Sequence, residues 1–446
     1  MSIDLTKAMN YSWMSQAAYL DITSVIPGSA DSLANYLKRI SINPGNIFAE
    51  KQADHFTDAS TGFSFIDQLP NTAYGTSITV FESNADGSYT LAVRGTEPSA
   101  QWGADLLHDI IGVFGAGKAK AQVFEAFRYY KRLTTAEGQS VVYTEAEIDA
   151  MAHLLQSDPS LAGSFGNLAA AATCFMTLTA DDEGLGLIPD GSVINFAGHS
   201  LGGHVAYLLA QLINATDGGI HTIGDVMTYN APGENALFYE IQNWFGIDTS
   251  SPAGLIGSKH LAFYAEAGLN VTAGLGQVIG TRVPLFIEDE GAVSGNILME
   301  NHSIVKLSDA LALYETFAIL SPSLTLGEIE EIFEKANASD LDSLETALDA
   351  LRTLLLDGDI ATNTSKQTPT GNRDTFYTHL YALQESDAYG DIKGEVTLSG
   401  NVMSLVSSAL TGAQNLPAEI FIPTERNSQI GFRNSRHLSG CPPARV

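Results

Sequence analysis

The chain has 446 residues, of which 45% are hydrophobic and 16% charged, enough apolar material for a large core, which excludes a disordered chain. Its formal net charge of −29 repels nucleic acid and excludes it as a partner class. With two cysteines, Cys174 and Cys441, the chain has no disulfide framework, so the fold must depend on its core.

Neither a secretory signal nor a membrane span is visible in the sequence. The N-terminus has no basic region followed by an apolar one, and no run of about 18 apolar residues occurs. We expect an extracellular location in the native host, reached through a signal that this chain does not carry, with a cytoplasmic location as the alternative.

The N-terminal half reads as a helix, a hairpin and further helices. Met9, Trp13 and Ala17 have helical spacing, which predicts a helix packed on the main body. Two alternating apolar runs in 76–95 meet at a turn, NADG at 84–87, and predict antiparallel strands. Residues 119–156 read as helices with a break at Gly138.

Short strands then alternate with helical segments. Apolar runs at 193–197, 226–229, 260–265 and 283–287 predict strands, and 201–213 predicts a helix directly after the first of them. This spacing suits βαβ crossovers, so we expect an α/β-hydrolase fold with a largely parallel central sheet flanked by helices, plus extra helices toward the C-terminus.

The C-terminal part has a different character. Residues 305–320 and 325–356 are helical in pattern, and 358–374 is a polar linker or loop. We therefore predict a catalytic core over 1–320, a helical appendage on or beside it over 321–425, and a disordered tail over 426–446.

The segment GHSLGG at 198–203 matches G-x-S-x-G between a strand and a helix, the context that gives this motif meaning. Glycines around Ser200 let strand and helix approach closely, and the helix N-terminus favours developing negative charge. We predict Ser200 as a nucleophile; the alternative is a glycine-rich turn that holds a buried serine.

A serine hydroxyl needs a base, and an acid that orients this base. His302 opens a helix after the last predicted strand, where the base of such a triad belongs; capping that helix is its alternative role, and His379 is the reserve base. His204 lies one turn along the helix after Ser200 and His221 lies on a glycine-rich loop, while His260 precedes a strand and is predicted to be structural.

The acid has several candidates between nucleophile and base. Glu266 follows the strand 260–265 and emerges at the catalytic end of a parallel sheet, whereas Asp225 precedes its strand. We choose Glu266, with Asp289 next and Glu288 and Glu290 also open. For each of them, an ordinary surface carboxylate is the alternative.

Acyl transfer also needs N–H donors for the oxyanion. The amide of Leu201 follows the nucleophile, and Thr96 ends the second hairpin strand with an N–H and a hydroxyl. We predict both as oxyanion donors, with a plain turn residue as the alternative for Thr96.

Three segments, LAVRGTEP at 91–98, INFAGHSLGGHVAYLLAQL at 194–212 and MTYNAPG at 227–233, resemble the oxyanion strand, elbow and next strand of class 3 (fungal-type) lipases. Segments 261–288 and 301–318 resemble the lipase-like N-terminal module of bacterial haemolysin-type calcium-binding repeat (RTX) proteins, whose repeats are absent here. The resemblance implies lipase, phospholipase or other carboxylesterase activity through Ser200, His302, an acid, Thr96 and Leu201. Class 3 lipases usually carry an aspartate just past the strand at 260–265, where this chain has Glu266.

We therefore expect a carboxylic ester hydrolase, a lipase or esterase that cleaves lipid acyl esters through an acyl-enzyme. The alternatives are a phospholipase, a polyester, amide or thioester hydrolase with the same site, and a catalytically silent binding module. The expected partners are an acyl-ester substrate and the lipid–water interface. No cofactor is expected; the acidity allows a structural Ca²⁺, although no EF-hand or β-roll spacing supports one. Residues 235–258 are predicted as an apolar lid, with plain packing as the alternative.

Overall fold

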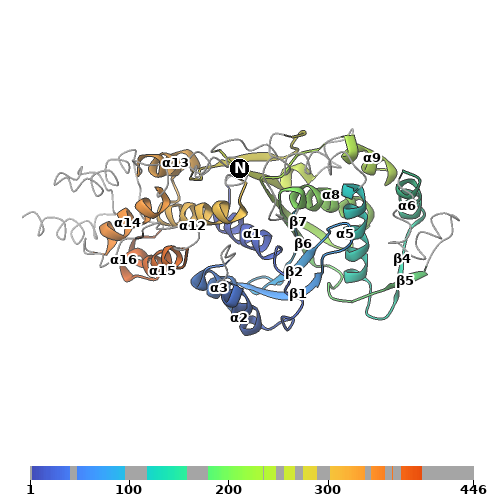
Figure 1. Ribbon diagram of the computed structural model, residues 1–446, viewed down its shortest axis with the longest axis horizontal. Coiled ribbons are helices and arrows are strands. Elements are labelled where there is room, and N and C mark those ends of the chain that lie inside the picture. The colour runs from blue at the N-terminus through green and yellow to red at the C-terminus, as the bar shows by residue number, and fades with distance from the viewer. Residues whose placement is uncertain are drawn as a thin grey trace, which may run out of the picture.

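The computed structural model describes residues 3–40, 48–95, 118–157, 179–234, 236–247, 256–266, 275–288, 302–336, 343–356, 364 and 373–393. A seven-stranded sheet forms its centre, in the order β1-β2-β3-β6-β7-β8-β9 (Figure 1). The strands are β1 (Phe63–Leu69), β2 (Ile78–Ser83), β3 (Tyr89–Val93), β6 (Val193–His199), β7 (Thr222–Tyr229), β8 (His260–Ala265) and β9 (Thr281–Leu285).

The sheet has an antiparallel part and a parallel part. β1, β2 and β3 pair antiparallel, while β3, β6, β7, β8 and β9 follow one another in parallel. Parallel neighbours require crossover connections, which place helices on the faces of the sheet. The predicted α/β-hydrolase fold with a largely parallel central sheet is confirmed.

Twelve α-helices surround this sheet within the described ranges. They are α1 (Leu5–Ala17), α2 (Ala30–Ile40), α3 (Glu50–Phe56), α5 (Lys118–Thr134), α6 (Glu145–Ser157), α8 (Leu201–Thr216), α9 (Ala236–Trp244), α12 (Ile304–Leu320), α13 (Leu326–Lys335), α14 (Ser343–Leu355), α15 (Arg373–Gln384) and α16 (Asp387–Ile392). The described elements also include a two-stranded antiparallel sheet, formed by β4 (Ser140–Val142) and β5 (Thr179–Glu183), and the 3₁₀-helix η3 (Ile256–Lys259).

Each face of the sheet has its own hydrophobic core. On β3, Leu91 and Val93 pack with α5 and α8, whereas Ala92 between them packs with α1 and α12. On β6, Phe196 packs with α5 and α8, and Ala197 packs with α1 and α12. Side chains of successive strand residues point to opposite faces, so a strand covered on both sides has apolar residues at nearly every position.

The predicted N-terminal helix is confirmed as α1. It packs on α12 and on β6, and Trp13 and Met14 are fully buried. The hydroxyl of Tyr229 on β7 donates to the carbonyl of Ala8 at 2.5 Å, so a polar contact also holds α1 against the sheet.

Several elements differ from the sequence prediction. The hairpin is confirmed as β2 and β3, but β1, α2 and α3 were not predicted. The segment 119–156 contains β4 between α5 and α6, and 325–356 forms two helices, α13 and α14, rather than one. β1 escaped prediction because Asp67 and Gln68 interrupt its apolar alternation; Gln68 is buried, and its amide donates to the carbonyl of Leu20 at 2.7 Å.

The C-terminal helices α13–α16 gather at the left end of the molecule, and α5, α6 and α9 at the right end (Figure 1). One hydrophobic cluster runs from Leu5 on α1 through α12 to Tyr389 on α16. The appendage helices therefore share a core with α1 and α12. The predicted domain boundary near 320 stays a prediction, and the predicted tail at 426–446 lies outside the described residues.

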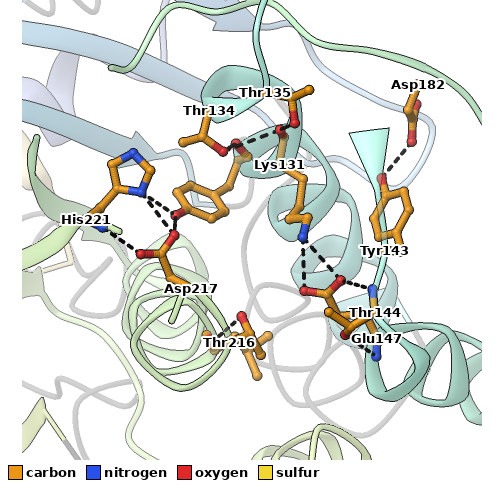
Figure 2. A network of polar contacts seen from close by, with 12 residues as sticks. Lys131, Thr134, Thr135, Tyr143, Thr144, Glu147, Asp182, Thr216, Asp217 and His221 are labelled. Atoms are coloured by element: carbon orange, nitrogen blue, oxygen red, sulfur yellow. Dashed lines mark hydrogen bonds and ion pairs between the residues drawn. The ribbon is translucent and has the colours of Figure 1, made fainter. Parts of the chain in front are cut away.

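Polar contacts fix the right end of the molecule (Figure 2). The Lys131 ammonium of α5 lies 3.2 Å from the Glu147 carboxylate of α6, and the Tyr143 hydroxyl donates to Asp182 at 2.7 Å. At the end of α8, Asp217 accepts from the His221 amide at 2.6 Å. The first contact joins α5 to α6, the second links the residue after β4 to β5, and the third closes the turn after α8.

Helix α9 lies in the segment predicted as a lid. Ile241 and Phe245 are buried, and the Phe245 ring lies 5.3 Å from the ring of Phe124 on α5. The Trp244 ring stacks on His153 of α6 at 5.9 Å. These contacts fit the packing alternative, and a lid stays a prediction.

A buried carboxyl on α12 predicts a pH-dependent stability. Burial raises the pKa of Glu315 from 4.5 to about 7, while Thr6 and Gln384 donate to it at 3.1 Å and 3.2 Å. Since the folded-state pKa is the higher one, stability falls as pH rises from about 4.5 through about 7. We expect Glu315→Gln to raise the free energy of unfolding by about 2 kcal/mol at pH 8 and by less at pH 5.

Urea unfolding at both pH values checks this expectation, with Glu331→Gln on the exposed face of α13 as the matched control. A Glu315→Gln midpoint that follows the wild-type midpoint at both pH values would contradict it.

Candidate functional site

Ser200 stands at a sharp turn between β6 and α8. Its backbone has φ 56° and ψ −134°, and Asn230 is the other non-glycine residue with positive φ among the described residues. This conformation is costly for a residue with a Cβ, so the surrounding structure must impose it. The Ser200 amide donates to the carbonyl of Tyr229 at 2.8 Å, which ties the turn to the end of β7. The geometry is that of a nucleophile elbow.

Glycines allow the close approach that the elbow needs. A Cβ built on Gly198 would lie 2.6 Å from the carbonyl of Gly202, and one on Gly202 would lie 2.3 Å from the carbonyl oxygen of Val93. Both contacts are with backbone atoms, which cannot rotate away. The motif glycines are therefore required for α8 to lie directly against β6 and β3.

The N-terminus of α8 and the end of β3 meet at Ser200. Leu201 is the first helical residue, and its amide belongs to the turn whose N–H groups have no acceptor within the helix. A Cβ built on Gly95 would lie 3.1 Å from the Cβ of Ser200, so the chain after β3 passes beside the serine. Thr96 follows Gly95 but lies outside the described residues, so its role stays a prediction.

His302 lies close to the residue that precedes Ser200. Its ring is 4.7 Å from the ring of His199, the neighbour of Ser200, with a tilt of 42° between the two rings. Burial lowers the pKa of His302 to about 4. The imidazole is therefore neutral at pH 7, which is the state that accepts a proton.

Glu266 lies at the end of β8 and is exposed. Its carboxyl shares a hydrogen bond with Glu330 of α13, and burial followed by this contact raises the pKa of Glu330 to about 7. Glu266 as triad acid thus stays a prediction.

The alternative acids occupy different places. Glu288 is buried, and its Oε1 accepts from the Leu344 amide at 3.1 Å. Asp225 forms an ion pair with Lys7 at 2.7 Å, in the first half of β7 rather than at its carboxyl end. Asp289 and Glu290 lie outside the described residues.

The other histidines have partners of their own. His221 contacts Asp217 at 3.0 Å, His260 contacts Thr228 at 2.9 Å, and His379 contacts Thr364 at 2.6 Å. His204 is buried within α8. These positions agree with structural roles for His204, His221 and His260.

The structure adds residues that the sequence analysis did not single out. Asn230 has φ 47° at the end of β7, and its side-chain oxygen accepts from the Ala265 amide at 2.9 Å, just before Glu266. His199 lies inside the elbow motif, at a position where the pattern allows any residue, and Tyr19 belongs to no motif. Polar side chains at strand ends were the available signal for Asn230 and His199, whereas Tyr19 follows a helix and had no such signal.

The described part of the chain contains neither a candidate metal cluster nor a candidate membrane span. No group of three or more His, Cys, Asp or Glu side chains there has an arrangement that suits a metal ion. No described helix combines the length and apolar character that crossing a bilayer requires.

The strand order and the elbow define an α/β-hydrolase fold. Neither a protein-family profile nor a curated protein sequence matches the chain. Similar solved structures include a fungal lipase in complex with an inhibitor, 12% identical over 65% of this chain and 82% of that one, with a TM-score of 0.28. The Lip2 lipase of Yarrowia lipolytica is 16% identical over 63% and 78%, with a TM-score of 0.26. Its nonglycosylated form is 17% identical over 64% and 81%, with a TM-score of 0.27.

Because α8 lies so close to β3, one methyl group added between them is expected to lower the stability of the fold strongly. We expect Gly202→Ala to lower the free energy of unfolding by about 3 kcal/mol, because the new Cβ meets rigid backbone. Gly327→Ala on α13 is the control, since a Cβ there has nothing within 4 Å. Urea unfolding of both variants checks the prediction, and equal midpoints for the two would contradict it.

Proposed function

We propose that this protein is a serine carboxylic ester hydrolase that cleaves lipid acyl esters. The observation that carries the proposal is the backbone of Ser200, held at φ 56° between β6 and α8 at the carboxyl end of a parallel sheet. Strain of this kind concentrates at functional sites, and a buried structural serine has no need of it.

In the proposed reaction, the neutral imidazole of His302 accepts the proton of Ser200 as the serine oxygen attacks the ester carbonyl. The amide of Leu201, together with that of Thr96, donates to the oxyanion of the tetrahedral intermediate. His302 then protonates the leaving alcohol. Water, deprotonated by the same imidazole, hydrolyses the acyl-enzyme and restores the serine. Glu266 is the proposed acid that orients His302.

Lipid esters are proposed as substrates because the oxyanion strand and elbow segments resemble class 3 lipases in sequence. The proposed likeness to the head module of RTX proteins rests on the sequence of residues 261–288 and 301–318. A lipid–water interface as partner and an extracellular location are part of the same proposal. The proposed chemistry requires no cofactor. A phospholipase, or a hydrolase of polyesters, amides or thioesters, would use the same groups, since the acyl pocket sets the choice.

The first test is the hydrolysis of p-nitrophenyl esters from two to sixteen carbons, together with labelling by an organophosphonate. We expect turnover and labelling of Ser200 in the wild type, and a loss of turnover of at least about 10⁴-fold, together with loss of the label, in Ser200→Ala. Ser192→Ala at the exposed start of β6 is the matched control.

The chain-length profile ranks lipase against esterase, and phosphatidylcholine hydrolysis identifies a phospholipase. A wild type that neither turns over nor takes up the label overturns the proposal and favours a binding module.

The low pKa of His302 predicts activity in acid. The base works when neutral, so activity falls as pH decreases through its pKa of about 4 rather than through the ordinary 6.5. We expect the acidic limb of kcat/KM below about pH 6. A pH–rate profile with short-chain esters measures it, and an acidic limb at pH 6.5 or above is the contrary result.

A further inference from the structure

Two hydrogen bonds connect Tyr19, His199 and His302 in a row. The Tyr19 hydroxyl lies 2.7 Å from Nδ1 of His199, and Nε2 of His199 lies 2.6 Å from the main-chain oxygen of His302. In sequence the first pair is 180 positions apart and the second 103 positions apart. The row therefore joins three segments that only the fold brings together.

The direction of both bonds follows from the chemistry of the groups. The carbonyl oxygen of His302 can only accept, so Nε2 of His199 must carry the hydrogen. A neutral imidazole has one N–H, which makes Nδ1 the acceptor of the Tyr19 hydroxyl hydrogen. Burial lowers the pKa of His199 well below its ordinary value, so the neutral ring persists. The carbonyl of His302 thus sets the tautomer of His199, and the Tyr19 hydroxyl donates to the ring nitrogen that carries no hydrogen.

The row passes directly beside the elbow. His199 is the last residue of β6 and immediately precedes Ser200. A Cβ built on Gly95 would lie 2.5 Å from the Tyr19 hydroxyl, 2.6 Å from the His199 carbonyl and 3.1 Å from the Ser200 Cβ. The phenol oxygen therefore lies where the end of β3 and the serine meet.

Both ends of the row belong to well-packed elements. Tyr19 follows α1, which packs on α12, and His302 stands two residues before the start of α12. The N-cap of α12, Ser303, makes no side-chain cap hydrogen bond. The His199 ring supplies a side-chain anchor at the main chain of the residue before this cap.

We propose that Tyr19 and His199 are positioning residues that hold the main chain of His302, and through it the imidazole, at a fixed place beside Ser200. This inference rests on the proposed hydrolase function, because it assigns His302 the part of the base. Neither Tyr19 nor His199 takes part in bond making. They act by keeping the base in its reactive geometry, where a displacement of about 1 Å costs on the order of 100-fold in rate.

The kinetic test compares Tyr19→Phe, His199→Phe and His199→Gln with the wild type. We expect kcat to fall about 10-fold in Tyr19→Phe and about 100-fold in His199→Phe, with KM within about 3-fold of wild type, because the chemical step is affected rather than substrate binding. His199→Gln keeps an N–H donor at the end of the side chain and recovers part of kcat. Tyr11→Phe on α1 is the matched control, since its hydroxyl bonds with Thr90 at the other end of β3.

A second measurement does not depend on activity. Hydrogen–deuterium exchange of residues 302–308 reports how firmly the start of α12 is held. We expect faster exchange there in Tyr19→Phe and His199→Phe, wild-type exchange in Tyr11→Phe, and unchanged melting temperatures within a few degrees.

The two readouts separate the two proposals. A wild type without esterase turnover overturns the proposed function, whereas the exchange data still decide whether His199 anchors His302. Unchanged exchange at 302–308 in His199→Phe overturns the anchoring. Unchanged kcat in an active His199→Phe enzyme overturns the positioning role. Loss of kcat with no recovery in His199→Gln also contradicts it.

Discussion

The structure depends on the close packing of α8 against three strands. A helix can lie this near to a sheet only where side chains are absent, and Gly198, Gly202 and Gly203 supply that space at β6, β3 and β7. The packing holds Ser200 in a backbone conformation that costs on the order of 1–3 kcal/mol. The cores on both faces of the sheet provide the stability that offsets this strain.

At the carboxyl edge of the sheet, neighbouring strand ends are linked in a series. The Ser200 amide donates to Tyr229 at the end of β7, and the Asn230 amide donates to Phe263 on β8. The side chain of Asn230 then accepts from Ala265. Ser200 and Asn230, the two non-glycine residues with positive φ within the described ranges, thus follow directly after adjacent strands, where these links begin. The edge that carries the candidate site is fixed by hydrogen bonds rather than by apolar packing alone.

The C-terminal helices connect with this edge through α12 and through Glu330 of α13. They share the core of α1 and α12, and Arg373 of α15 forms a buried ion pair with Asp309 of α12 at 2.7 Å. From the same group, Glu330 of α13 reaches the carboxyl of Glu266 after β8. The helices therefore contribute both to the stability of α12 and to the surroundings of the candidate acid.

The sequence by itself determined the hairpin, the parallel strands and the elbow, because alternation, turn residues and the G-x-S-x-G spacing are local patterns. It also supplied Ser200, Glu266 and His302 as candidates for a triad, and these roles stay predictions. Only the tertiary structure decided which distant residues come into contact and which become buried. Examples are the burial of Glu315, the contact of Glu266 with Glu330, and the row from Tyr19 through His199 to His302. Such contacts join residues separated by up to hundreds of positions, and no local periodicity encodes them. β1 shows the same limit, since the side chain of Gln68 is satisfied by Leu20 on a distant segment and not by a neighbour in its strand.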